Sequence, residues 1–193
     1  MRLIYIAFAS TIALSSCGDT KTSDTAATTQ AVPSAPPQTN LGEEGTNAVL
    51  STVGNYYELK DALVATKAPK VAETAVNLER MAKDMRETLF ASDSTHSRDM
   101  IKPYVDTIVA QAAKIAAIND PSCEQQRIAF EPLTRALYEL LKKVETKNAK
   151  IYHQYCPMAF NDKGAYWLSS VTDIKNPYFG KKMLECGEVT DSM

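Results

Sequence analysis

The sequence predicts an all-α domain: an up-down-up-down four-helix bundle with an irregular C-terminal segment, rich in Cys, Met and aromatic residues, packed on it. The 193 residues are 45% apolar, which is enough for one domain but short for two. Between residues 46 and 150, apolar side chains recur at three- and four-residue steps in four stretches of about 20 residues. Short polar breaks separate these stretches, as neighbouring antiparallel helices require.

The first three predicted helices are placed by their apolar stripes and by the residues at their ends. The first covers residues 46–66. The second begins near Pro69, because proline suits the first turn of a helix, and it ends at the polar run 92–95. The third follows this run, and Pro103 either begins it or kinks it. The stripes are Val49, Val53, Tyr56, Tyr57, Leu63 and Val64, then Val71, Ala75, Leu78, Met81, Met85 and Leu89, then Ile101, Tyr104, Val105, Ile108, Ala112 and Ile115.

The fourth predicted helix follows a turn and cap at residues 119–122. Glu124 lies in its first turn, where a negative charge favours the helix, and Pro132 is expected to bend it. Its apolar stripe consists of Ile128, Phe130, Leu133, Leu137, Leu140, Leu141 and Val144. The four stripes together predict the core of the bundle.

The chain changes character after Lys150, because the helical period stops and glycine, proline and aromatic residues become dense. Turn residues at 161–164 and 176–177 can fold Cys156 back towards Cys186. Four aromatic residues are expected to form a small core that docks this segment on the bundle: Tyr166, Trp167, Tyr178 and Phe179. The predicted domain is therefore 46–193, with its motifs within 151–190.

The N-terminus is typical of a signal peptide, residues 1–16, whose apolar run is too short to span a bilayer. The sequence Leu-Ser-Ser-Cys at 14–17 looks like a bacterial lipobox, which predicts that Cys17 becomes a lipidated N-terminus; the alternative is an ordinary secretory signal with an incidental cysteine. A Thr/Ser/Pro-rich stretch completes a disordered tether over 17–45. These features predict a protein held on the membrane of the bacterial cell envelope by its lipid anchor, facing the periplasm or, alternatively, the cell surface.

Two classes of function are disfavoured by the sequence. The formal net charge is −2 and no block dense in Lys and Arg is present, so we expect no nucleic-acid partner. We also expect no enzymatic activity, because the motifs of hydrolases, zinc proteases, phosphate-binding loops and haem attachment are missing. A nucleophile built from Cys156 and His153 would lack the third group that orients such a pair.

The soft side chains of the C-terminal segment suggest a metal site. Thiolate, thioether and imidazole ligands together select Cu(I), or Ag(I) by the same chemistry. The candidates are Cys156, Met158, Met183 and Cys186, with His153 as an adjunct. In an extended segment, Cys156 and Met158 would share one side. In a helical turn, three-residue spacing would pair His153 with Cys156, and Met183 with Cys186.

A disulfide between Cys156 and Cys186 is the alternative that the spacing leaves open. In an oxidising compartment it would close a loop of about 30 residues and stabilise the fold by about 3.5 kcal/mol. The two methionines would then pack in the core, and His153 would be a surface or buried imidazole that binds no metal. Cys123, at the start of the fourth helix, is expected to be a small, partly buried thiol outside the site.

Several C-terminal blocks resemble a bacterial envelope domain family of unknown function. They are Tyr-Cys-Pro-Met-Ala at 155–159, Gly-Ala-Tyr-Trp-Leu-Ser at 164–169, Ile-Lys-Asn-Pro-Tyr-Phe-Gly at 174–180 and Met-Leu-Glu-Cys-Gly at 183–187. In the helical part, 56–64 and 126–130 are also similar, so the resemblance covers about residues 47–190. That family occurs as stand-alone lipoproteins and as a C-terminal extension of periplasmic adaptor subunits of heavy-metal efflux pumps.

The resemblance implies that the protein handles a soft metal ion through Cys156, Met158, Met183 and Cys186. It implies a role as a buffer, chaperone or efflux accessory, with adaptor or pump components as partners. The alternative function is a disulfide-stapled, non-enzymatic protein-interaction module of the envelope that binds no metal.

Overall fold

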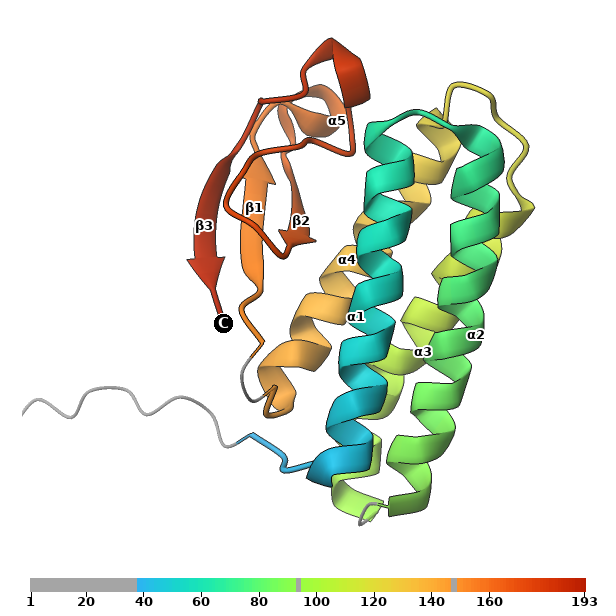
Figure 1. The fold of residues 1–193 in the computed structure, drawn as a ribbon, viewed down its shortest axis with the longest axis vertical. Coiled ribbons are helices and arrows are strands. Elements are labelled where there is room, and N and C mark those ends of the chain that lie inside the picture. The colour runs from blue at the N-terminus through green and yellow to red at the C-terminus, as the bar shows by residue number, and fades with distance from the viewer. Residues whose placement is uncertain (1–37, 93–94, 147–148) are drawn as a thin grey trace, which may run out of the picture. The chain divides into compact units, whose positions relative to one another are not determined.

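The computed structural model describes residues 38–92, 95–146 and 149–193, which form four long helices followed by a small β-sheet (Figure 1). The predicted signal peptide, Cys17 and most of the predicted tether lie outside the described residues. None of the helices within the described ranges is both long enough and apolar enough to cross a membrane.

The helices are α1 (Gly42–Val64), α2 (Ala68–Ser92), α3 (Thr95–Ala117) and α4 (Glu124–Lys143). Consecutive helices lie side by side and alternate in direction, as a helical bundle requires (Figure 1). The first helix begins at Gly42, inside the stretch assigned to the tether, where Glu43 and Glu44 place negative charge in its first turn.

The predicted stripes form most of the buried core. Of the residues proposed for it, Tyr57, Val64, Met81 and Tyr104 are only half-buried, and the prediction for Ile128 is wrong, because 51% of this residue is exposed. The buried face of α4 runs instead through Gln126, Arg127, Ala129, Phe130 and the residues at the same helical spacing beyond them. Ile128 lies on the opposite side of the helix, where it meets solvent.

The chain is mostly helical, as predicted, but it is not strictly all-α, and its C-terminal segment is not irregular. This segment forms a three-stranded antiparallel sheet of β1 (Tyr152–Cys156), β2 (Ala165–Ser169) and β3 (Glu188–Ser192), in the order β2-β1-β3. The aromatic residues of β1 and β2 favour these segments as strands. All residues of β3 are exposed, so this strand carries no apolar pattern from which it could be predicted.

Aromatic side chains join the sheet to the bundle. Tyr56 of α1 stacks on Phe130 of α4 with ring centroids 5.1 Å apart, and Phe130 lies 5.9 Å from the ring of Tyr178. The Tyr56 hydroxyl accepts the backbone N–H of Leu168 in β2 at 3.1 Å. Trp167 is fully buried. The predicted aromatic core is therefore present, except that Tyr166 is 43% exposed.

A left-handed turn follows β1. The short element α5 (Ala159–Asp162) has positive φ at three consecutive non-glycine residues: Phe160, Asn161 and Asp162 (φ 53°, 58° and 62°). Such residues cost about 1–2 kcal/mol each in this conformation. The turn is closed by a hydrogen bond from the Gly164 N–H to the Ala159 carbonyl, 2.9 Å long. At Gly164, φ is 76° and a Cβ atom would lie 2.0 Å from the Tyr155 hydroxyl oxygen, so only glycine fits.

Two neighbouring glycine substitutions are expected to change stability in opposite directions. Asp162→Gly removes the backbone strain of a non-glycine residue at positive φ. It should raise the free energy of unfolding by about 0.5–1 kcal/mol, because glycine adopts this φ without penalty. Lys163→Gly, at φ −76°, only adds flexibility and should lower it by about 0.5–1 kcal/mol. Urea unfolding followed by circular dichroism measures both. If both variants lose the same stability, the left-handed turn does not exist in solution.

Candidate functional site

The sheet brings Cys156 and Cys186 together. Cys156 is the last residue of β1, and Cys186 comes two residues before β3, which pairs antiparallel with β1 through Tyr155 opposite Glu188. The end of one strand therefore meets the start of the other, and the two thiols lie close enough to affect each other's titration. Cys156 is buried and Cys186 is half-buried. Both are free thiols, so either a metal ion or a disulfide can join them.

The surroundings of Cys186 keep its thiol protonated. Its hydrogen bond to Cys156, together with burial, raises the pKa of the Cys186 thiol above its usual range, and the backbone N–H of Met158, which donates to the sulfur, opposes this shift. An ion that binds this sulfur as a thiolate must therefore displace a proton at neutral pH.

The segment between β2 and β3 carries Cys186 and is held by Asn176, which is fully buried. The Asn176 Nδ2 donates to the Cys186 carbonyl at 2.8 Å, and its Oδ1 accepts the backbone N–H of Tyr178 at 2.8 Å. The Asn176 backbone N–H also donates to the Leu184 carbonyl at 2.8 Å. One side chain thus fixes both ends of the loop that presents Cys186.

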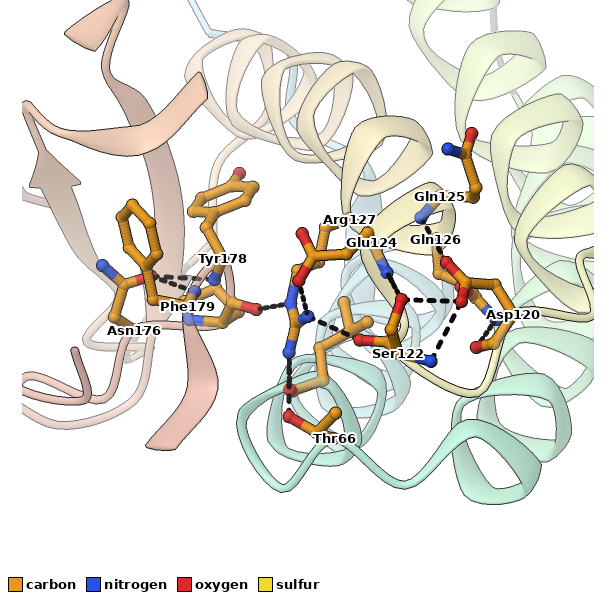
Figure 2. A network of polar contacts seen from close by, with 12 residues as sticks. Thr66, Asp120, Ser122, Glu124, Gln125, Gln126, Arg127, Asn176, Tyr178 and Phe179 are labelled. Atoms are coloured by element: carbon orange, nitrogen blue, oxygen red, sulfur yellow. Dashed lines mark hydrogen bonds and ion pairs between the residues drawn. The ribbon is translucent and has the colours of Figure 1, made fainter. Parts of the chain in front are cut away.

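Arg127 of α4 connects that loop to the bundle (Figure 2). Its side chain is only 3% exposed. The Nε donates to the Pro177 carbonyl at 2.8 Å, and Nη2 donates to the Leu63 carbonyl at 3.0 Å and to the Thr66 hydroxyl at 2.9 Å. The Nη1 donates to the Ser122 carbonyl at 2.8 Å and to Glu124 at 3.0 Å. One guanidinium therefore joins the end of α1, the turn before α4 and the loop that carries Cys186.

The turn before α4 is itself capped by Asp120, which belongs to the same network and is joined to Arg127 through Ser122 (Figure 2). The Asp120 carboxylate accepts the backbone N–H groups of Ser122 at 2.9 Å and Gln125 at 3.0 Å. The Ser122 hydroxyl donates to it as well, and these bonds lower the pKa of the Asp120 carboxyl. The structure thus confirms the turn and cap predicted at 119–122.

Met158 and Met183 line one hollow of about 450 Å³, whose lining includes neither of the two thiols. Phe160, Tyr178 and Phe179 form its aromatic wall. Met158 is 47% exposed, and the Cys186 N–H donates to the Met183 carbonyl at 3.2 Å, so a backbone turn joins Met183 and Cys186. The chain leaves the extended conformation after Cys156, so the expectation that an extended segment would put Met158 on the same side is wrong.

His153 lies away from the thiols. Because β1 is extended, residues three apart face opposite sides of the sheet, and the expectation that a helical turn would pair His153 with Cys156 is wrong. The imidazole instead stacks between Tyr138 and Tyr166, with centroid distances of 3.8 and 4.4 Å. The structure therefore groups four of the five predicted ligands around the loop at the end of β1 and separates the fifth.

Cys123 is fully buried at the start of α4, at φ 61°. Burial raises the pKa of its thiol, while the nearby Arg127 guanidinium opposes this shift. Over the described ranges, no three His, Cys, Asp or Glu side chains gather where they could hold a metal ion. A site at Cys156 and Cys186 would therefore consist of two thiolates with thioethers nearby.

Sequence reasoning did not identify Arg127 and Asn176 as residues that shape the site. Arg127 belongs to the Gln-Arg-Ile-Ala-Phe block at 126–130, and Asn176 to the Asn-Pro pair interpreted only as a turn. One feature of the sequence could have identified Arg127: it is a basic residue on a helix face that is otherwise buried.

Comparison with known proteins gives one match. The sequence profile of a family described as protein of unknown function (DUF3347) matches residues 52–149. This range runs from α1 to just beyond α4, so the sheet and the two thiols lie outside it. Neither the curated proteins nor the solved structures include a match to the chain.

Proposed function

The chain belongs to the DUF3347 family of proteins of unknown function, so the function has to be inferred from the site. We propose that the protein binds a soft monovalent metal ion, Cu(I) or Ag(I), between Cys156 and Cys186. The contact between these two thiols carries the proposal. Sulfur ligands prefer soft ions, whereas Ca²⁺ and Mg²⁺ prefer oxygen. Met158 and Met183, which line one hollow and are close in sequence to Cys156 and Cys186, would give an incoming soft ion thioether ligands.

The proposal includes the setting in which the ion is handled. A lipid on Cys17 would hold the domain in the bacterial cell envelope, facing the periplasm, where it would serve as a buffer, chaperone or efflux accessory. The lipobox-like residues 14–17 and the resemblance to domains attached to efflux adaptors support this setting. An adaptor or pump component would then receive or deliver the ion.

Native mass spectrometry of the reduced, full-length chain carrying Cys17→Ser tests the binding. With Cu(I) supplied anaerobically, we expect one copper ion per chain and the loss of the thiol protons that it displaces. Cys123→Ser is the matched control, because it removes a buried thiol outside the site, and it should bind the same single ion. The proposal fails if no copper is retained, or if a Cys156→Ser, Cys186→Ser double variant retains it equally well.

The affinity for Cu(I) is expected to rise with pH. Protons compete with the metal for the same sulfur atoms, so a lower pH weakens binding. Release of two protons would raise the apparent affinity by about a hundredfold per pH unit between about pH 6 and about pH 8. Competition titrations at several pH values measure this slope, which should fall to about tenfold per unit in Cys156→Ser. An affinity that is independent of pH would contradict binding by thiolates.

The same contact between thiols favours a second candidate, a disulfide-stapled interaction module without metal. Mild alkylation of protein purified without reductant, followed by intact-mass measurement, distinguishes the two. A disulfide would protect Cys156 and Cys186 from the reagent until reduction, and the protein would then lose about 3.5 kcal/mol of stability when reduced. Alkylation of Cys186 without prior reduction would support free thiols available to a metal.

A further inference from the structure

A second hollow, of about 510 Å³, lies between α4 and the sheet. Residues on one side of α4 form its first wall, and side chains from all three strands form the other. Its size is in the range that holds a small organic ligand or an amino-acid side chain. We call it the α4–sheet hollow, and none of the four grouped sulfur ligands lines it.

A column of three stacked rings forms the centre of this hollow. The His153 imidazole lies between Tyr138 of α4 and Tyr166 of β2, almost parallel to both, at interplanar angles of 5° and 8°. His153 is only 8% exposed. Within the described ranges, neither of its ring nitrogens has a hydrogen-bonding partner. These nitrogens are not among the fully buried polar atoms that lack a partner in the described residues, so they are open to the hollow, where a ligand can form a hydrogen bond with them.

Negative charge is in excess around the hollow. Glu131 and Glu139 of α4 are paired with Arg135 at 3.8 Å and Lys142 at 3.2 Å. Asp191 of β3 accepts hydrogen bonds from the Tyr138 hydroxyl at 3.1 Å and the Ser192 N–H at 2.8 Å. Across the part of the chain that is described, no cationic side chain pairs with Asp191. An anion would be repelled here, and a cation would find an unneutralised carboxylate.

His153 complements such a cation. Burial lowers the pKa of the imidazole, against the opposing effect of the nearby Asp191 carboxylate. A neutral imidazole has one nitrogen that accepts a hydrogen bond. A ligand with several N–H groups can therefore donate one hydrogen bond to His153 and another to Asp191. The carbon atoms of such a ligand would lie beside the edges of the tyrosine rings.

We propose that the α4–sheet hollow binds an organic cation that carries a primary ammonium or guanidinium group, with Asp191 as its charge partner and His153 as its hydrogen-bond acceptor. A polyamine or the side chain of a Lys or Arg residue in a peptide has this chemistry. The proposal is independent of the thiol site, because His153 and Cys156 face opposite sides of β1.

Aromatic ¹H–¹³C NMR of the full-length Cys17→Ser chain, titrated with agmatine, tests the proposal. We expect saturable shifts of the His153, Tyr138 and Tyr166 ring signals. Asp191→Asn should weaken binding about tenfold or more, because a charged hydrogen bond is lost. Asp84→Asn, at an exposed carboxylate on α2, is the matched control and should bind as the parent does.

His153→Phe separates the role of the ring nitrogens from that of the stack, because phenylalanine can still stack between the tyrosines. This variant should fold, as judged by its Tyr138 signals, and bind agmatine more weakly. Spermidine and an arginine-containing tripeptide amide identify which source of the cation binds more tightly. The proposal is overturned if agmatine causes no saturable shift, if Asp191→Asn and His153→Phe bind it unchanged, or if acetate produces the same shifts.

Discussion

Replacing Cys186 with serine is expected to lower the affinity of the protein for Cu(I) by roughly several hundredfold. The serine hydroxyl is a hard ligand that stays protonated near neutral pH, so one of the two thiolates is lost. A metal–thiolate bond accounts for roughly a quarter of the binding free energy of a four-ligand structural site, which is about 3–4 kcal/mol. Anaerobic competition with a chromogenic Cu(I) chelator measures this change.

The Cys123→Ser variant provides the control for this measurement, because Cys123 is a buried thiol at the start of α4. It should compete for Cu(I) as the parent protein does. Circular dichroism checks that both variants remain folded. The two thiols do not form the site if Cys186→Ser retains the parent affinity for Cu(I), or if Cys123→Ser loses as much affinity as Cys186→Ser does.

The Arg127→Met variant is expected to lower the free energy of unfolding by about 3–5 kcal/mol. Methionine keeps the apolar stem but removes every donor of the guanidinium. Three backbone carbonyls, those of Leu63, Ser122 and Pro177, then lose a charged hydrogen-bond donor in a buried setting. Each such loss costs about 1–3 kcal/mol, and relaxation of the loop recovers part of the sum. Urea unfolding followed by circular dichroism measures the total.

Arg135→Met is the matched control for this prediction. Its side chain is 70% exposed and lies 3.8 Å from Glu131, so its removal should change stability by no more than about 0.5 kcal/mol. Arg127→Lys should recover little of the loss, because one ammonium cannot reach carbonyls on three sides. A change below about 1 kcal/mol for Arg127→Met would show that the guanidinium does not hold the loop to the bundle.

The helices could be predicted from the sequence because each buries one face. Residues such as Val49, Val53 and Leu63 recur at helical spacing and lie in the core. Ile128 does not follow this pattern, because it is an apolar residue on the solvent side of α4. β3 could not be predicted, because Glu188–Ser192 is exposed on both faces and the burial that creates an alternating pattern is missing.

The candidate site was only partly predictable for a related reason. Turn residues suggested that Cys156 and Cys186 could meet, and the pairing of β1 with β3 brings them together. The place of His153 depended on whether β1 was a strand or a helical turn, which spacing alone does not decide. Arg127 and Asn176 act through bonds to distant backbone carbonyls, and such bonds leave no periodic signal in a sequence.

X-ray absorption at the copper K-edge, on the one-to-one complex of the reduced chain with Cu(I), tests the central claim most directly. If Cys156 and Cys186 hold the ion, the first coordination shell contains sulfur only, and the edge has the shape of Cu(I) at low coordination number. Nitrogen or oxygen atoms in the first shell would contradict the proposed site, and so would a first shell that is unchanged in the Cys156→Ser, Cys186→Ser double variant.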